Sequence, residues 1–176
     1  MNLTPAMQKF VLHWGEMGTR WGINRTVAQV HALLYISPRP LSAEELAKTL
    51  SVARSNISTC LRELQAWGLV KITHVLGDRR DQFETFRDVW AMFKLVLQER
   101  KRREIDPTLV VLREAVAQAE KAGAGEEPVR ERLAEMLDFF ETAMDGYEEI
   151  VRMSPAALKR VAKYGSKLQK LLGIGT

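Results

Sequence analysis

The sequence predicts a mainly helical protein of the α+β class, in which four helices are followed by one β-hairpin and then by further helices. Three observations predict this fold. Apolar residues recur at helical spacing over most of the chain, the spacing changes to alternation after Gly68, and turn-forming residues separate two short alternating runs. With 176 residues, of which 46% are hydrophobic, the chain is long enough for one domain with an appended helical part.

The first two predicted helices are amphipathic. In the first, one apolar stripe is formed by Met7, Phe10, Val11, Trp14 and Met17. We expect Gly18, Gly22 and Asn24 to break this pattern. The second helix is predicted over residues 26–36, and it ends in the segment 37–40 because proline cannot continue the hydrogen-bond ladder.

The next two helices are predicted from their ends. Ser42 and Glu45 have the spacing of a capping box, and Leu41 and Leu46 are placed for a hydrophobic staple. A short turn then leads into a helix over residues 54–67, where the following glycine is expected to form the C-terminal cap. Two helices joined by so short a turn form a helix-turn-helix.

A β-hairpin is predicted directly after this motif. Val70 and Ile72 alternate with polar residues, with His74 as the next position of the same face. Residues 77–81 form a turn, and residues 82–86 form the returning strand. A hairpin that follows a helix-turn-helix makes a winged helix.

The rest of the chain is predicted to be helical. The starts of its helices are marked by capping residues or first-turn prolines: Asp88, Asp106 with Pro107, Pro128, and Ser154 with Pro155. The four cations at 100–103 wind around a helix and are interpreted as a solvated helix end. Residues 123–127 are the clearest linker. We assign residues 1–104 to a winged helix-turn-helix DNA-binding domain with a long connecting helix, and residues 105–176 to a helical dimerisation region.

The charge is unevenly distributed between these parts. Residues 1–104 hold 16 Lys and Arg against 10 Asp and Glu, whereas residues 105–176 hold 10 against 12. A basic N-terminal part suggests that this part meets a polyanion. Chance asymmetry between two solvated surfaces is the alternative, so the motifs must decide.

The helix over residues 54–67 is the candidate recognition helix. Ile57, Leu61 and Leu64 share one face and should anchor it in the core. The polar residues predicted to meet DNA are Arg54, Ser55, Asn56, Ser58, Thr59 and Arg62. In a helix-turn-helix the N-terminal half of this helix enters the major groove, where Arg pairs with guanine and Asn with adenine. The alternative is an ordinary amphipathic helix with a polar outer face.

The tip of the wing carries two further candidates. Arg79 and Arg80 stand between Asp78 and Asp81. Arginines on a hairpin tip can reach phosphates or the narrow minor groove, where the potential is most negative. In the alternative interpretation, the aspartates and arginines satisfy each other on a solvated turn, and both descriptions can hold together.

The C-terminal helices are predicted to mediate association. Their apolar stripes include the predicted dimerisation residues Val129, Leu133, Met136, Phe140, Tyr147, Leu158, Val161 and Leu168. Stripes this wide need partners on more than one side, and a second copy of the chain is the economical partner. Such a homodimer can place two recognition helices about one DNA turn apart. The alternative is an intrachain helical hairpin.

Motifs for catalysis, cofactors and membranes are not found. His13, His31 and His74 lie in different predicted elements without metal-ligand spacing, and we expect structural roles for them. The single cysteine, Cys60, forms no intrachain disulfide and is expected to be a small buried hydrophobe. No apolar run is long enough to span a membrane, and no signal peptide is seen. We expect a cytoplasmic protein that is not an enzyme, with no cofactor, no metal and no membrane partner.

Five segments carry a resemblance to a known family. They are residues 41–47, residues 52–58, residues 64–70, the wing 77–80 with Phe83, and the stretch from 90–93 to 102–107. The chain resembles the MarR superfamily of bacterial winged-helix regulators, and more closely its GbsR-type branch. The resemblance covers residues 10–120 well, and the last fifty residues match only in pattern.

This resemblance implies a homodimeric transcriptional regulator that binds double-stranded DNA and is usually a repressor. Some members respond to choline-like or betaine-like ligands, so a small-molecule effector is a further candidate partner. A quaternary ammonium favours an aromatic cage. The candidate aromatic residues are Trp14, Trp21, Trp67, Trp90, Phe83, Phe86 and Phe93. The alternative is that these side chains fill the core, so the effector is left open. A rival hypothesis is a winged-helix module that binds proteins and uses the helical tail as an assembly scaffold.

Overall fold

The computed structural model describes residues 2–171, and its side chains are described to residue 164 except that of Ala124. The chain divides into two compact units, the winged-helix unit (residues 1–96) and the C-terminal unit (residues 97–176). The functional boundary predicted at residues 104 and 105 remains a prediction. Most of the chain is helical, as predicted, and one small antiparallel sheet completes the winged helix.

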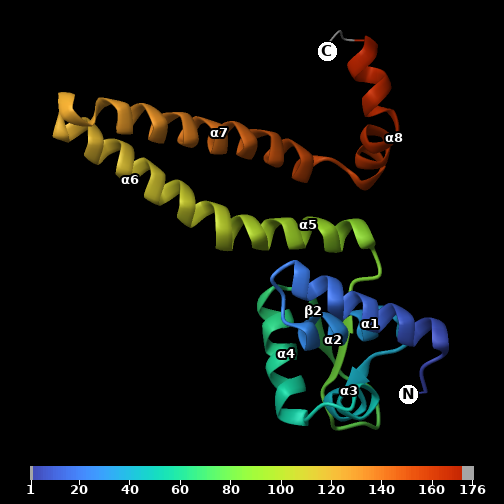
Figure 1. The fold of residues 1–176 in the computed structure, drawn as a ribbon. Helices are drawn as coiled ribbons and strands as arrows, with labels where there is room; N and C mark the ends of the chain where they lie inside the picture. The colour runs from blue at the N-terminus through green and yellow to red at the C-terminus, as the bar shows by residue number, and fades with distance from the viewer. Residues whose placement is uncertain (1, 172–176) are drawn as a thin grey trace. The chain divides into compact units, whose positions relative to one another are not determined.

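The winged-helix unit follows the predicted order of elements (Figure 1). It contains α1 (Pro5–Arg20), α2 (Arg25–Ile36), β1 (Leu41–Ser42), α3 (Ala43–Leu50), α4 (Arg54–Ala66), β2 (Val70–Thr73), β3 (Gln82–Thr85) and the first part of α5 (Val89–Arg100). Its core is formed by buried residues of α2, α3, α4 and the sheet, with Leu33, Leu41, Leu46, Ile57 and Leu61 among the largest.

The helix ends of the motif form as predicted. The Ser42 hydroxyl accepts from the backbone N–H of Glu45 at 3.3 Å, and the Glu45 carboxylate accepts from the backbone N–H of Ser42 at 2.9 Å. At the other end of the motif, Gly68 has a φ of +69°, and the N–H of Leu69 donates to the carbonyl of Leu64 at 2.9 Å. Because glycine adopts this left-handed conformation without a Cβ penalty, it closes α4 as expected.

The prediction that Gly18 breaks the first helix is wrong. Gly18 lies inside α1, which continues to Arg20, and it is buried against α2. A Cβ at Gly18 would lie 2.5 Å from the Cβ of Ala28, so the glycine allows α1 and α2 to pack closely side by side (Figure 1). Gly22, with a φ of +76°, does lie in the turn after the helix.

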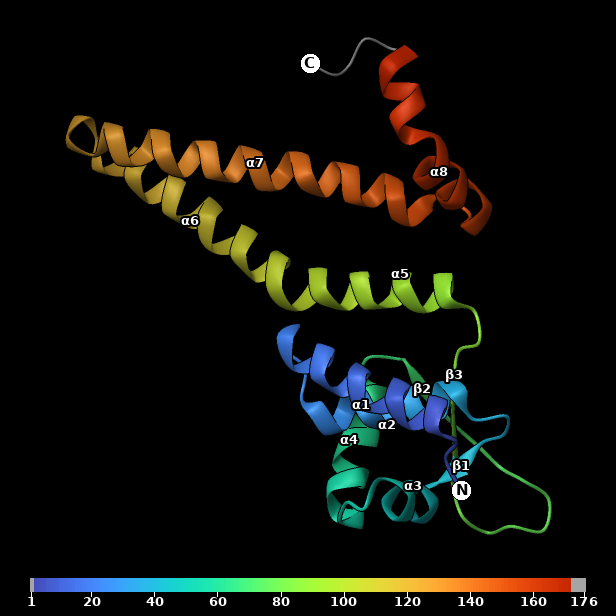
Figure 2. The same cartoon turned by 45° about the vertical axis from the view of Figure 1, so that its right-hand side comes forward.

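The sheet has one strand more than the sequence predicted. Its order is β1-β3-β2, and both pairings are antiparallel, with Leu41 and Ile72 opposite Phe83 on either side. The predicted alternation holds in part, because Val70 is buried whereas Ile72 is exposed and His74 lies beyond the strand. The loop from β2 to β3, drawn in green, extends away from the helices as the wing (Figure 2).

The C-terminal unit is a set of long helices. It contains a π-helical turn (Lys101–Ile105), α6 (Asp106–Ala122), a 3₁₀ turn (Ala124–Glu126), α7 (Glu127–Arg152) and α8 (Pro155–Leu171). The helices α6 and α7 run side by side, and Arg113 of α6 donates to the Glu141 carboxylate of α7 at 2.7 Å (Figure 1). Within the described part of the chain, no helix has the length and apolar content needed to cross a membrane.

Asp106 does not cap a helix, contrary to the prediction, although α6 does begin there with Pro107 in its first turn, as predicted. The chain stays helical through a π turn, and the Asp106 carboxylate accepts from Lys101 Nζ at 2.6 Å. Pro107 lacks an N–H, and its ring would clash in a regular α-helix, so the wider π turn that precedes it accommodates the proline. Of the basic run, Arg100 ends α5 and the other three cations lie in the π turn, so the run is not at a helix end as predicted. Its cations pair with nearby acids, such as Arg100 with Glu104 at 3.1 Å.

Candidate nucleic-acid interface

The core fixes the orientation of α4. Ile57, Leu61 and Leu64 are almost fully buried, as predicted, and they hold one face of the helix against the rest of the winged-helix unit. The opposite face carries the predicted polar residues. Ser58 is half-buried, and five are exposed: Arg54, Ser55, Asn56, Thr59 and Arg62. The structure therefore places the predicted residues on one helix surface.

Hydroxyl groups on this surface are bonded to their own helix. Ser58 Oγ donates to the carbonyl of Arg54 at 3.0 Å, and Thr59 Oγ1 donates to the carbonyl of Ser55 at 3.2 Å. Each hydroxyl has one hydrogen, so both oxygens are left to accept hydrogen bonds. Thr59 already accepts from Arg62 at 3.1 Å. In these conformations the hydroxyl oxygens act as acceptors. They therefore suit hydrogen-bond donors, such as base amino groups, better than they suit phosphates, which are acceptors themselves.

Arg54 is anchored by an acid that the sequence patterns do not reveal. Its Nε donates to Glu44 Oε1 of α3 at 2.6 Å. The pKa of the Glu44 carboxyl is lowered, because it accepts from its own backbone N–H and from Arg54. This ion pair bridges the two helices of the helix-turn-helix at the start of the recognition helix.

The two wing arginines differ in their surroundings. A turn closed by the N–H of Asp78 on the carbonyl of Val75, at 3.0 Å, precedes them. The Asp78 carboxylate accepts from Arg80 Nε at 2.9 Å and from Gln82 Nε2 at 2.9 Å, and the Arg80 guanidinium holds the pKa of Asp78 well below its usual range. Arg79 is exposed, and no hydrogen bond or ion pair to it is found in the described part of the chain.

A shallow groove lies between α4 and the hairpin. Its volume is about 270 Å³. Among its lining residues are Arg54, Ser58, Arg62 and Arg80, together with the acids Glu44 and Asp81. The fold therefore brings four of the eight predicted DNA-binding residues to one groove, whereas Arg79 is not among the residues that line it.

The predicted dimerisation residues are mostly accessible in the single chain. Val129, Met136 and Val161 are exposed and Leu158 is buried. The side chains of Leu133, Phe140 and Tyr147 are half-buried. The side chain of Leu168 lies outside the described residues. Phe139, 63% exposed on the same helix α7, belongs to this surface as well.

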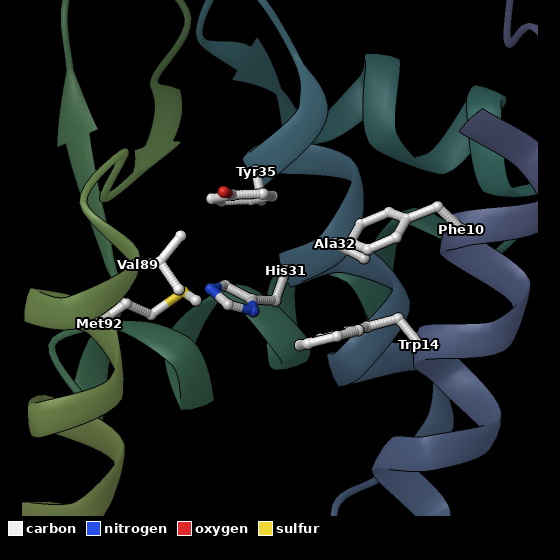
Figure 3. Close-up of a pocket in the computed structure, with 7 residues that line it drawn as sticks. All are labelled: Phe10, Trp14, His31, Ala32, Tyr35, Val89 and Met92. Carbon is white, nitrogen blue, oxygen red and sulfur yellow. The ribbon is translucent and has the colours of Figure 1, made fainter. Parts of the chain in front are cut away.

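An aromatic pocket of about 140 Å³ lies within the winged-helix unit. It is lined by Phe10, Trp14, His31, Ala32, Tyr35, Val89 and Met92, and the ring of His31 points into it (Figure 3). Of the aromatic residues considered from the sequence, only Trp14 lines this pocket. Phe10 and Tyr35 lie on the inward faces of α1 and α2, where apolar spacing gives no sign of a cavity.

His31 is held in the neutral form at this pocket. Thr85 Oγ1 donates its hydrogen to the carbonyl of Leu69 at 2.6 Å, so it accepts from His31 Nε2 at 3.2 Å. Burial lowers the pKa of His31 to about 4. Among the residues that the structure describes, no cluster of His, Cys, Asp and Glu has the geometry of a metal site.

Comparisons with known proteins agree with this geometry. Residues 21–81 match a family model described as MarR family. The chain is 23% identical over 137 residues to the HTH-type transcriptional repressor GbsR of Bacillus subtilis (strain 168), and the match covers 76% of each chain. It also resembles a crystal structure of a transcriptional regulator, with a TM-score of 0.58 and 23% identity over 90% of this chain and 99% of that chain.

Proposed function

We propose that the chain is a winged-helix transcriptional regulator of the MarR family and of the GbsR type, and that it represses transcription by binding a specific DNA site as a homodimer. One observation carries the proposal. The face of α4 that lies opposite its buried side presents a continuous polar surface of Arg, Ser, Asn and Thr, beside a wing that carries the exposed Arg79.

In this proposal the N-terminal half of α4 enters the major groove. Arg54 pairs with a guanine, because its donors match the O6 and N7 acceptors of that base. Asn56 pairs with an adenine, because its amide matches the N7 acceptor and the N6 donor. The hydroxyls of Ser58 and Thr59 meet base edges, and Arg62 contacts the backbone at the rim of the groove. The wing reaches the flanking backbone or minor groove through Arg79, with Arg80 beside it.

The proposed dimer is supported by the apolar surface of α7. This helix of 26 residues has no buried residue in the single chain, although Val129, Met136 and Phe139 lie on it. Exposed apolar surface of this extent is typical of an association site. A second copy would cover it and would bring two recognition helices to one DNA site.

The aromatic pocket is the proposed effector site. The faces of Phe10, Trp14 and Tyr35 would attract a choline-like cation, and no carboxylate lines the pocket (Figure 3). An effector bound there would act by shifting the population between dimers that fit the DNA and dimers that do not. Quenching of tryptophan fluorescence by choline, lost in Trp14→Leu, tests this part of the proposal.

The main test is a fluorescence-anisotropy titration of the protein with the DNA upstream of its own gene and with a scrambled duplex, over a series of salt concentrations. We expect binding at least about 10³-fold tighter to the upstream DNA, a steep salt dependence and two chains per site. Equal and weak binding to both duplexes, and to the other intergenic fragments of the genome, would instead favour the protein-binding module.

A further inference from the structure

We infer that Glu44 is a positioning residue for base recognition: by holding Arg54 through Nε, it leaves the two terminal amino groups of that arginine aligned for one guanine. This inference rests on the proposed function, because it presupposes that α4 enters the major groove. It adds a residue outside the recognition helix to the determinants of sequence preference.

The contact geometry supports this role. A guanidinium offers two pairs of parallel N–H donors, one of which uses Nε and the other of which uses both terminal nitrogens. Glu44 Oε1 occupies Nε at 2.6 Å, and no hydrogen bond to the terminal nitrogens of Arg54 is found among the described residues. The end pair therefore stays available, and it matches the O6 and N7 acceptors of guanine.

The backbone that carries this acid is anchored. Glu44 lies in the first turn of α3, next to the Ser42–Glu45 capping box, and the buried Leu46 anchors the same helix in the core. An arginine that is already oriented loses less conformational freedom when it binds. Glu44 on α3 therefore limits the movement of Arg54, the first residue of α4.

The negative charge of Glu44 favours preference for one DNA sequence over affinity for DNA of any sequence. A carboxylate next to Arg54 reduces the attraction of this arginine for phosphates, which every DNA sequence offers equally. The pairing of base edges is retained because the end pair of donors is unaffected. Arg80 differs, since Asp78 occupies both its Nε and Nη2, at 2.9 Å and 2.6 Å. Arg54, rather than Arg80, is therefore presented for a base.

The inference is tested by selecting bound sequences from a pool of duplexes with random base pairs, because such a pool contains every candidate site. The wild type is compared with Arg54→Ala, Glu44→Ala, Glu44→Gln and the double variant Glu44→Ala/Arg54→Ala. Glu16→Gln is the matched control, because Glu16 is an exposed acid on α1 and the change in net charge is the same. Circular dichroism and sedimentation verify that each variant keeps its fold and self-association.

We expect Arg54→Ala to remove a preference for G·C at one position of each half-site. Glu44→Ala is expected to lower the preference at that same position by about 10-fold, with binding to random DNA unchanged or stronger. Glu44→Gln keeps an acceptor and should retain most of the preference, and the double variant should equal Arg54→Ala.

Three results would overturn the inference. If Glu44→Ala keeps the G·C preference while Arg54→Ala loses it, Glu44 does not position the arginine, and the proposed function stands. If Arg54→Ala changes no base preference, both Arg54 and Glu44 lose their assigned roles. If the wild type selects no sequence from the pool, the proposed function itself fails.

Discussion

The buried imidazole of His31 is expected to make the stability of the winged-helix unit depend on pH. His31 is only 8% exposed and donates from Nε2 to Thr85. Protonation would add a second N–H and a positive charge beside a pocket whose other lining residues are apolar or aromatic (Figure 3). The folded protein therefore resists protonation of His31, whereas the unfolded chain does not.

The magnitude follows from the lowered pKa of His31, about 4 against 6.5 in the unfolded chain. Because the folded state binds fewer protons, the free energy of unfolding falls as the pH falls from about 6.5 to about 4, and the contribution is fully present above that window. The total loss is about 3 kcal/mol, of which about 2 kcal/mol is expected between pH 7 and pH 5.

Urea titrations at pH 7 and pH 5 measure this loss. His31→Gln keeps an N–H donor for Thr85 but does not ionise, so its stability is expected to change much less with pH, whatever its stability at pH 7. His13→Gln, at an exposed position on α1, is the control and should behave as the wild type. An equal loss of stability between pH 7 and pH 5 in the wild type and His31→Gln would refute this reasoning.

Three further predictions concern packing, capping and association. Gly18→Ala is expected to lower the free energy of unfolding by about 1–3 kcal/mol, because the new methyl would lie 2.5 Å from the Cβ of Ala28. Adding Ala28→Gly should recover part of this loss in urea titrations, and strictly additive losses would contradict close packing there. Ser42→Ala removes the capping box with Glu45 and should cost about 1 kcal/mol, so an unchanged urea midpoint would argue against the cap. Phe139→Ser should weaken self-association in sedimentation experiments without lowering monomer stability, and an unchanged dimer fraction would remove Phe139 from the interface.

Features set by neighbouring residues could be predicted from the sequence. The capping box of Ser42 and Glu45 forms as expected, and Gly68 closes α4, because each depends on residues only a few positions apart. The buried face of α4 also follows from helical periodicity. The family resemblance, carried by short segments, agrees with the match of residues 21–81 to the MarR family.

Features set by distant residues could not be predicted. The strand β1 is two residues long, which is too short for a periodic pattern, and it exists because Leu41 pairs with Phe83 far along the chain. Glycine disfavours helices, which is why Gly18 is expected to end one, but close packing against Ala28 outweighs that preference. Asp106 has the sequence context of a cap, yet its carboxylate bonds to Lys101 within a continuous helical stretch.

The candidate site could be predicted only in part, because some of its features depend on neighbouring residues and others on residues far apart in the sequence. The spacing of Arg54 and its neighbours places them on one face, which the structure bears out. The ion pair between Arg54 and Glu44 depends on how α3 and α4 approach each other, and spacing alone does not reveal it. The pairing of Arg80 with Asp78 is local and is one of the two interpretations of the wing sequence, whereas the exposure of Arg79 emerges only from the folded wing.

The central claim, that α4 enters the major groove and the wing reaches the flanking backbone or minor groove, is tested most directly by affinity cleavage. The sole cysteine is replaced by Cys60→Ser, and an iron–EDTA label is attached through Arg79→Cys at the wing. With DNA selected by the labelled protein, we predict two clusters of cuts, symmetric about the centre of the site, with the 3′ offset between strands that marks the minor groove. Cuts spread evenly along the duplex, or a 5′ offset that places the label in the major groove, would contradict the account.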